Sequence, residues 1–239
     1  MKRLKRFYDK VSVKCVEKDL YHLLLDSRTV RTPLGGTLSF KSEGIASAVG
    51  SEWEIQGEFV IPNSMPMNSI MMTFLDVDSK LGRGEKEKQI SRFLQTDTLR
   101  FPAEKSDSAL ARAQGKYWEK PKTFLRETMK LELTRGNAFS VPSSTDAEIA
   151  EIRERILSKY DGLDLTLLET GAKFLKSGSL AIALIEGAVT AEEAWQAAYA
   201  EELSQRENWG LVEGEHDYHD AETLLWLNGV GLLASLKKC

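Results

Sequence analysis

Apolar and polar positions alternate in short runs near the start of the chain. Val11, Val13 and Cys15 share one face of the first run, and turn-forming residues at 26–28 and 33–36 separate the runs that follow. Alternation with a period of two is typical of a β-strand with one buried face. Gly, Pro, Asp and Ser at the breaks are typical of turns. The pattern therefore predicts a small antiparallel meander at the N-terminal end.

The spacing of apolar residues becomes helical after this meander. Ile45, Val49 and Trp53 recur at intervals of four and form an apolar stripe, and Ser42 is a suitable N-cap for it. A helix with one apolar face must bury that face against another element. We therefore expect this helix to cover the sheet and to bury Trp53.

The second part of the chain is helical almost throughout. We expect helices at residues 84–95, 106–120, 122–133, 145–160, 163–176, 179–186, 190–209 and 220–236. Pro121 should divide two of them, because the residue before a proline is displaced from the helical region. Residues 96–101 should form an extended link. Asp161 with Gly162 should end one helix, and Asp220 should cap the last one.

The predicted fold class is α+β, with a small N-terminal antiparallel sheet and covering helix followed by a multihelical C-terminal domain. We place the boundary so that residues 1–103 form the α+β domain and residues 104–239 form the helical domain. Within the helical domain, residues 179–186 are apolar nearly all round. That composition predicts a central buried helix.

Four of the six methionines lie within eight residues, at Met65, Met67, Met71 and Met72. Methionine is flexible and polarizable, so it fills irregular gaps in a core and also serves on surfaces that adapt to a partner. The sequence leaves both readings open.

Composition and charge exclude several classes of protein. Of the 239 residues, 42% are hydrophobic and 28% are charged, as in an ordinary folded domain. The apolar runs of the chain are too short to span a membrane. The basic N-terminal stretch MKRLKRFYDK is not followed by the apolar core of a signal peptide. Two cysteines are too few for a disulfide framework. A net charge of −4 without a basic stripe argues against nucleic acid.

Negative charge is concentrated in one part of the chain. Residues 186–222 hold eleven acidic residues and one basic residue, Arg206, in a chain whose net charge is only −4. Thr190 and Glu193 have the spacing of a capping box at the start of a helix in this stretch. A concentrated negative surface can attract a basic partner. A solvated helix face is the alternative explanation.

A search for catalytic chemistry finds one weak signal. The chain has no phosphate-binding G-x-x-x-x-G-K-[ST] loop and no G-x-S-x-G elbow. A cluster that could bind a divalent metal consists of Glu213, Glu215, His216, Asp217, His219 and Asp220. The pair His216 and His219 would still need two further ligands in a defined geometry. Capping and hydrogen bonding at the last helix explain the same residues.

Five ordered motifs together resemble one family. They are RFYDKVSV (6–13), LLLDSRTVRTPLGGTLSF (23–40), EWEIQGEFVIPNSMPMNSI (52–70), FLQTDTLRF (93–101) and EELSQRENWGLVEGEHDY (201–218). The chain resembles the chaperones that assemble the catalytic head of the F-type ATP synthase by holding its α subunit, the assembly factor 2 family. It departs from the family pattern at Ser204 and Asn208, and residues 104–143 match loosely apart from Trp118.

The resemblance implies a holdase that is not an enzyme and needs no cofactor. It would bind the unassembled α subunit and cover the surface that later meets β. The implied contact residues are Glu201, Glu202, Gln205, Trp209, Gly210, His216 and Asp217. Trp53, Met65 and Met67 carry over as a second contact or as packing.

The same resemblance implies a monomer in the mitochondrial matrix, with the bacterial cytoplasm as the alternative, and neither nucleic acid binding nor membrane insertion. Two other functions stay open on the residues alone. One is a metal-dependent hydrolase that uses His216, His219 and the neighbouring carboxylates. The other is a generic acidic adaptor for a different basic protein.

Overall fold

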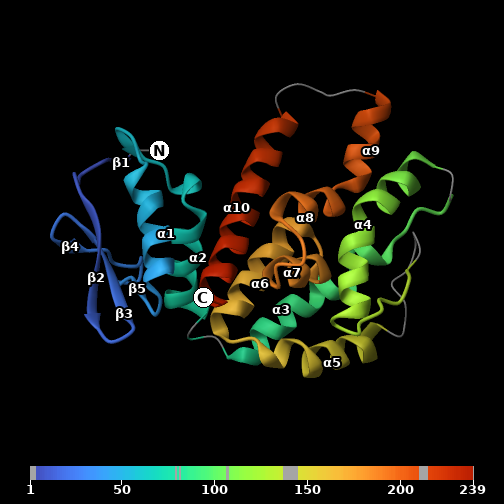
Figure 1. Ribbon diagram of the computed structural model, residues 1–239, viewed down its shortest axis with the longest axis horizontal. Coiled ribbons are helices and arrows are strands. Elements are labelled where there is room, and N and C mark those ends of the chain that lie inside the picture. Colours follow the sequence, from blue (N-terminus) through green and yellow to red (C-terminus); the bar gives the residue numbers. More distant parts are fainter. Residues whose placement is uncertain are drawn as a thin grey trace. The chain divides into compact units, whose positions relative to one another are not determined.

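The computed structural model describes residues 4–78, 80, 82–105, 108–136, 145–209 and 215–238. The strands are β1 (Leu4–Lys5), β2 (Val11–Glu17), β3 (Leu20–Leu25), β4 (Arg28–Thr29), β5 (Ser39–Phe40) and β6 (Phe59–Val60). The α-helices are α1 (Glu43–Glu54), α2 (Pro66–Thr73), α3 (Arg83–Gln95), α4 (Ala109–Glu127), α5 (Thr145–Arg155), α6 (Gly162–Leu175), α7 (Gly178–Ile185), α8 (Ala191–Ala198), α9 (Ala200–Trp209) and α10 (Glu215–Lys238). Short 3₁₀ turns are η1 (Pro62–Ser64), η3 (Thr98–Arg100) and η4 (Leu157–Lys159), and η2 (Phe74–Asp78) is π-helical (Figure 1).

The chain divides into two compact units. The first consists of Met1–Gly82 with Leu232–Cys239, and the second is Arg83–Gly231. The predicted α+β class, with a small antiparallel sheet and many helices, is confirmed. The division does not fall at the boundary expected between residues 103 and 104. The physical reason is α3, which packs against α5, α6 and α7 and therefore belongs to the helical unit.

The first unit is built on the predicted meander. β2, β3 and β4 pair antiparallel in that order, β5 also pairs with β3, and Val13 lies opposite Leu23. β1 and β6 form a separate antiparallel pair. Asp26 turns the chain after β3 with a φ of 55°, and its carboxylate accepts the N–H groups of Asp9 and Lys10. These two hydrogen bonds hold the pKa of Asp26 below its usual value.

Helix α1 covers this sheet, as the sequence predicts, by packing on β2 and β3. The Ser42 side chain caps it by accepting the N–H of Ile45. The stripe Ile45, Val49 and Trp53 is buried, with Trp53 only 8% exposed. The Trp53 indole N–H donates to Asn68 Oδ1 at 3.0 Å, so the ring is fixed by a buried hydrogen bond as well as by packing.

A buried carboxylate joins α1 to α2. Glu52 is 5% exposed. Its two oxygens accept the N–H groups of Met67 and Asn68 at 2.9 and 2.7 Å. Met65, at the start of α2, provides no side-chain cap, so Glu52 satisfies amides that would otherwise be free at the helix start. Burial raises the pKa of Glu52 to about 7, against the opposing effect of the two hydrogen bonds.

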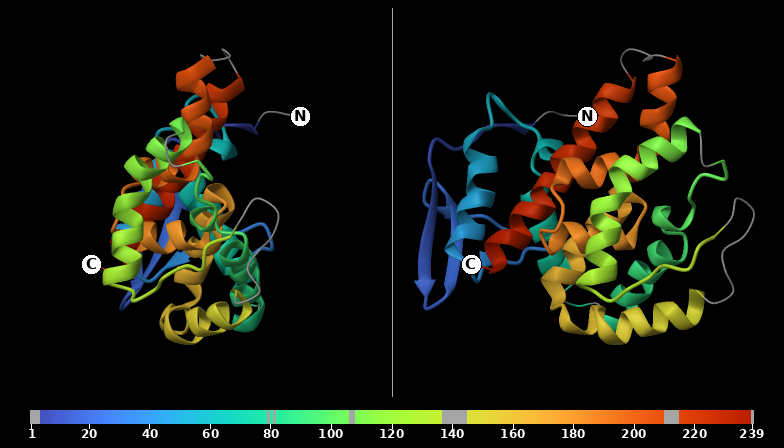
Figure 2. Two further views of the ribbon diagram at one scale, coloured as in Figure 1. Left: turned by 90° about the vertical axis from the view of Figure 1, so that its right-hand side faces the viewer. Right: turned by 45° about the vertical axis from the view of Figure 1, so that its right-hand side comes forward.

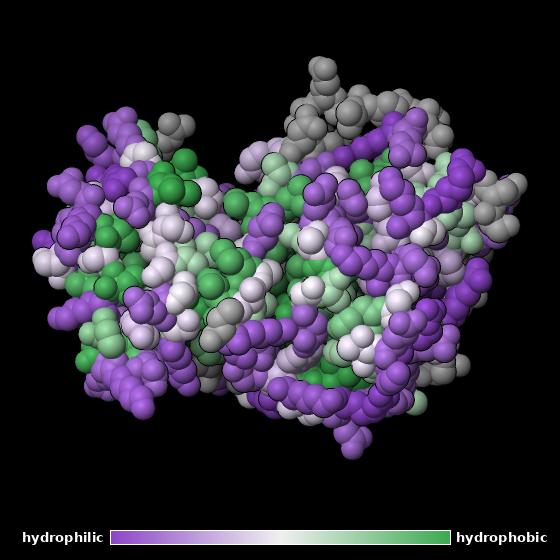
Figure 3. Space-filling view, in the orientation of Figure 1, coloured by the Kyte–Doolittle hydropathy of each residue, from purple (hydrophilic) through white to green (hydrophobic). Residues whose placement is uncertain are grey.

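Apolar side chains reach the surface of the first unit at several places. Leu4, Phe7, Ile55 and Ile61 are each more than half exposed. Figure 3 shows such apolar groups among hydrophilic ones on this unit. Isolated exposed apolar side chains are ordinary in soluble proteins.

The second unit surrounds α7, which is buried along its whole length. Helices α3, α4, α6 and α8 pack against it (Figures 1 and 2). This confirms the central buried helix predicted at residues 179–186. Gly178 is the first residue of α7. A Cβ atom there would lie 2.8 Å from Leu94 Cγ, so only glycine allows α7 and α3 to approach this closely.

Residues 96–101 are not the extended link that we expected. Asp97, which caps η3, and Arg100, the last residue of η3, are completely buried. Asp97 accepts hydrogen bonds from the Ser177 hydroxyl at 2.7 Å and the Ser179 N–H at 2.8 Å. Ser177 in turn caps α7 by accepting the N–H of Leu180. The segment is therefore a structural junction, and Asp97 organises the start of the central helix.

Arg100 is paired on the other side of the same junction. Its guanidinium donates to the Leu94 carbonyl at 2.8 Å and to both carboxylate oxygens of Glu148 at 2.6 and 3.2 Å. Burial alone would raise the pKa of Glu148, but hydrogen bonds from Arg100 and Thr134 outweigh it and lower that pKa. A buried guanidinium is stable only when it is paired in this way.

Two other helix boundaries differ from the prediction. α4 is one helix with Pro121 inside it, because its packing against α7, α8 and α9 outweighs the missing backbone hydrogen bond, which typically costs about 3 kcal/mol. Asp161 begins α6 instead of ending the preceding helix, and it forms a capping box with Asp164. Among the described residues, no helix combines the length and the apolar character that crossing a membrane requires.

Replacing Trp53 with Ala should lower the free energy of unfolding by about 3–5 kcal/mol, because a large buried side chain is replaced by a cavity. Urea unfolding followed by circular dichroism measures this. The control is Ile55→Ala, at a residue 74% exposed, where we expect a change within about 0.5 kcal/mol. Equal effects of the two substitutions would contradict the burial of Trp53.

The stability of the protein should also depend on the protonation of Glu52. The pKa of this side chain is about 7 in the folded protein, against a reference value of 4.5. Between these values the folded state binds more protons, so the free energy of unfolding decreases as pH rises through 7. The contribution is up to about 3 kcal/mol.

Urea midpoints measured from about pH 5 to about pH 8 test this dependence. The Glu52→Gln variant cannot ionise at this position. The two proteins should therefore differ least at low pH, where Glu52 is protonated, and the free energy of unfolding of wild type should fall relative to that of the variant as pH rises to about 8. A difference that stays constant with pH would show that Glu52 does not titrate in this range.

Candidate partner-binding site

The acidic stretch forms two helices rather than the single one that we expected. The Thr190–Glu193 capping box is present at the start of α8. Tyr199 interrupts the helix with φ −104° and ψ 24°. Its ring is buried and its hydroxyl donates to the Phe174 carbonyl at 3.0 Å. This anchor redirects the chain, so that α9 packs beside α4 (Figure 2).

Helix α9 carries three of the residues expected at the partner surface. Glu201 and Gln205 are exposed one turn apart, and Glu202 is half-buried. The Gln205 amide donates to Glu201 Oε1 at 3.4 Å. Ser204 is buried, with 4% of its surface exposed. A small residue at this position lets α9 lie close to its neighbours.

Glu201 and Glu202 line a hollow with a volume of about 530 Å³, which we call the acidic hollow. Its other lining residues are Phe93, Thr96, Thr98, Phe101, Gln114, Trp118, Lys176, Ala198 and Ala200. The Trp118 indole N–H donates to the Ala197 carbonyl at 2.8 Å and fixes the ring. The hollow thus offers two carboxylates beside aromatic and small apolar side chains.

Much of the remaining negative charge is compensated inside the unit. Glu193 pairs with Lys120 at 2.6 Å, and this contact is the main reason that the pKa of Glu193 is lowered. Asp220 accepts two hydrogen bonds from the guanidinium of Arg206, one of them at 3.2 Å. Glu201 and Glu202 form no ion pair within the described residues. They are therefore the carboxylates best placed to meet a cation from a partner.

Several expected site residues cannot be placed. Gly210 and the side chains of Trp209, His216 and Asp217 lie outside the part of the chain that the structure describes. The same is true of Glu213 and the side chain of Glu215, which belong to the expected metal cluster. His219 is described, and its Nε2 lies 3.3 Å from the Tyr199 hydroxyl.

Asp220 does not cap the last helix as predicted. α10 already begins at Glu215, so Asp220 lies inside it. There its carboxylate is occupied by Arg206 of α9. The ion pair therefore joins α9 to α10.

The second group of expected contacts lies in the first unit and is buried. Met65 is 1% exposed, and Met67 and Trp53 are each 8% exposed. These side chains pack in the core of that unit. Of the two readings left open for the methionines, burial favours core packing for Met65, Met67 and Met71.

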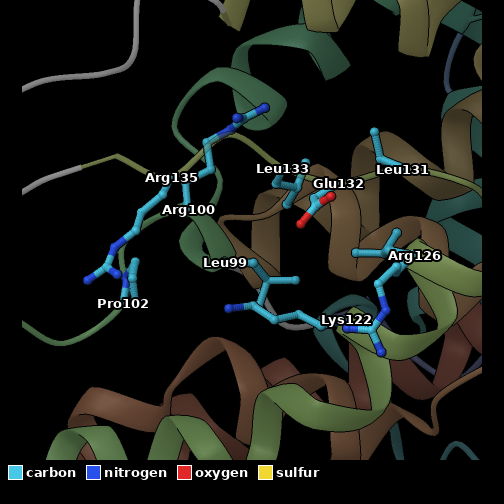
Figure 4. Close-up of a pocket in the computed structure, with 10 residues that line it drawn as sticks. Leu99, Arg100, Pro102, Lys122, Arg126, Leu131, Glu132, Leu133 and Arg135 are labelled. Atoms are coloured by element: carbon cyan, nitrogen blue, oxygen red, sulfur yellow. The ribbon is translucent and has the colours of Figure 1, made fainter. Parts of the chain in front are cut away.

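A second hollow, which sequence reasoning missed, is rich in positive charge (Figure 4). This basic hollow has a volume of about 310 Å³. It is lined by Leu99, Arg100, Pro102, Lys122, Leu125, Arg126, Leu131, Glu132, Leu133 and Arg135. Burial is the main cause of a lowered pKa of Lys122, and the nearby charge of Arg135 adds to it. The motif spacing gave no signal for this hollow, because Lys122, Arg126 and Arg135 belong to the loosely matching stretch 104–143.

Breaking the Arg206–Asp220 pair should loosen α9. Both side chains are less than a fifth exposed, so Asp220→Asn should cost about 1–3 kcal/mol in the free energy of unfolding. Urea unfolding measures the change. The matched control is Glu151→Gln, which removes the exposed pair with Arg155 and should cost under about 0.5 kcal/mol. Equal costs would mean that the Arg206–Asp220 pair stabilises the protein no more than an exposed ion pair does.

The whole chain is similar to known proteins. The family model described as ATP12 chaperone protein matches residues 5–126. The chain is 24% identical to Protein atp12, mitochondrial, of Schizosaccharomyces pombe, over 98% of this chain and 82% of that protein. It is also 24% identical to Protein ATP12, mitochondrial, of Saccharomyces cerevisiae, over 90% of this chain and 79% of that protein.

Solved structures share the fold. The crystal structure of Atp12 from Paracoccus denitrificans has a TM-score of 0.83 at 24% identity and covers 98% of both chains. The Atu1473 protein of Agrobacterium tumefaciens has a TM-score of 0.85 at 29% identity, over 97% of this chain and 85% of that one. The resemblance inferred from the motifs is thereby confirmed. Because the matching family model covers more than half of the chain, this protein belongs to the ATP12 chaperone family.

Proposed function

We propose that this chaperone assists assembly of the catalytic head of the F-type ATP synthase by holding the unassembled α subunit until β takes its place. Membership of the ATP12 chaperone family supports a role in this assembly. The acidic hollow is the observation that supports this surface as the binding site for the α subunit. It joins signature carboxylates of α9 to an apolar wall on the same face of the helical unit.

The chemistry of this hollow suits the surface of an unassembled subunit. Such a surface exposes apolar side chains that will later be buried in a subunit interface, and these would otherwise cause aggregation. Phe93 and Phe101, which are partly exposed, can cover apolar groups of the partner. Glu201 and Glu202 can select a segment that also carries a Lys or Arg side chain.

The protein would act by binding alone, without catalysis or a cofactor, and as a monomer. The two yeast relatives are mitochondrial proteins, and the Paracoccus relative is bacterial. We propose the mitochondrial matrix as the site of action, with the bacterial cytoplasm as the alternative.

A light-scattering assay of refolding α subunit, carried out without ATP, tests the proposal. This protein should suppress aggregation at a near-stoichiometric ratio, and a complex with α should elute on gel filtration. Aggregation that proceeds unchanged, with no complex, would overturn the proposal.

The double variant Glu201→Gln with Glu202→Gln should bind the α subunit about tenfold more weakly, because two exposed charge interactions are lost. Its thermal unfolding should match that of wild type, since neither carboxylate forms an ion pair within the described residues. Fluorescence anisotropy with labelled α gives the affinity.

Glu207→Gln is the control for this variant. It removes one negative charge from the same helix, at an exposed position away from the acidic hollow. If Glu207→Gln weakened binding as much as the double variant, general negative charge and not the hollow would be responsible.

A further inference from the structure

One face of α4 runs along three hollows that share lining residues. A middle hollow of about 300 Å³ shares Gln114 and Trp118 with the acidic hollow. It shares Pro102 and Lys122 with the basic hollow. We call the three together the α4 trough. Its floor therefore continues from the carboxylates of α9 to the cations near the end of α4.

The α4 side of this trough is a single helical stripe. Its members recur at intervals of three and four residues, as Ala111, Gln114, Gly115, Trp118, Lys122, Leu125 and Arg126. Residues at these intervals lie on one face of a helix. At 1.5 Å per residue, the twelve steps along the helix from Gln114 to Arg126 span roughly 18 Å. A chain in extended conformation covers that length with about five or six residues.

The two ends of the trough carry opposite charge. At one end are Glu201 and Glu202, and Lys176 lines the same hollow. The Lys176 ammonium lies over the Tyr199 ring, 5.2 Å from its centroid. The carboxylates of this end are therefore left to interact with a partner.

The other end is lined by Lys122, Arg126 and Arg135 and by one carboxylate, Glu132 (Figure 4). A second carboxylate, Glu119, lines the middle hollow beside Lys122. Arg100 is not available, because Glu148 holds its guanidinium. Within the described residues, Arg135 forms no ion pair, and Arg126 has only a long, exposed contact with Glu127 at 3.5 Å. Lys122 lies over the Trp118 ring at 4.3 Å, which keeps its ammonium in the trough. This end has a surplus of positive charge.

We propose that the α4 trough binds one extended segment of the partner, whose basic residue meets Glu201 and Glu202 and whose acidic residue, about five or six positions away, meets Lys122 and Arg135. Apolar side chains between these two charged residues lie against Pro102 and Ala111, which line the middle hollow. Opposite charges at the two ends fix the direction in which the segment lies. The proposal rests on the proposed function, because it takes the α subunit as the partner.

Affinity for the α subunit tests the basic end of the trough. Lys122→Gln combined with Arg135→Gln should weaken binding about fivefold to tenfold, comparable to the effect of neutralising the acidic end. Lys116→Gln is the matched control, since Lys116 is an exposed lysine of α4 that lines none of the three hollows. Thermal unfolding of each variant confirms that it is folded.

The outcomes separate this inference from the proposed function. If wild type fails to bind α, the proposed function fails. If wild type binds α and the Lys122/Arg135 variant binds equally well, only the inference on the trough is overturned. An equal loss with Lys116→Gln would also overturn it, because general positive charge would then explain the effect.

An array of overlapping peptides from the α subunit tests the orientation of the segment. Peptides that bind wild type should contain a Lys or Arg and an Asp or Glu about five or six residues apart, and exchanging those two residues should abolish binding. Peptides that still bind after the exchange would overturn the proposed direction.

Discussion

Asp97 is a carboxylate without access to water, and the arrangement of the helical unit depends on how it is satisfied. Its burial raises its pKa, while the Ser179 N–H, the Ser177 hydroxyl and the Leu99 N–H oppose that rise. Removing any of these donors would leave a buried carboxylate with fewer hydrogen bonds, which is costly. The start of α7 and the turn η3 are therefore held in one geometry. Since α7 is the element on which α3, α4, α6 and α8 pack, that geometry is transmitted to the surface helices.

The candidate binding surface follows from this framework. η3 is followed by Phe101 and Pro102, which line the hollows beside α4. α4 is held to α8 by the hydrogen bond from Trp118 to Ala197 and by the pair of Lys120 with Glu193. The carboxylates of α9 then lie across from the aromatic side chains of the same trough. Rigid elements, rather than a loop, position the groups that a partner would meet.

The sequence predicts the parts of this structure that depend on neighbours along the chain. The stripe of α1, the capping box of α8 and the apolar α7 are all set by residues within one or two turns. The junction at Asp97 and Arg100 could not be predicted in this way, because Ser177 is 80 residues and Glu148 is 48 residues away. Pro121 shows the same limit, since tertiary packing keeps α4 continuous where local preference would end it.

The residues of the candidate site also fall into two groups, those that a local motif predicts and those that only the tertiary fold brings together. Glu201, Glu202 and Gln205 could be named because they belong to a motif, and the structure places them on one helix. Lys122, Arg126 and Arg135 belong to no motif, and they come together only when α4 and the segment after it meet. Burial of Trp53 follows from the helical spacing of its stripe, whereas burial of Met65 and Met67 was open in the sequence, because an apolar residue in a motif can serve packing or contact equally well.

The charges at the trough are arranged for recognition more than for tight binding. Glu201, Arg126 and Arg135 are exposed, and exposed ion pairs contribute little to affinity and weaken with salt. They do accelerate encounter and exclude partners with the wrong charge pattern. Under the proposed function, the chaperone would pass its partner to another subunit, which requires selectivity together with release. Apolar contacts along the trough, framed by weak opposite charges, meet both requirements at once.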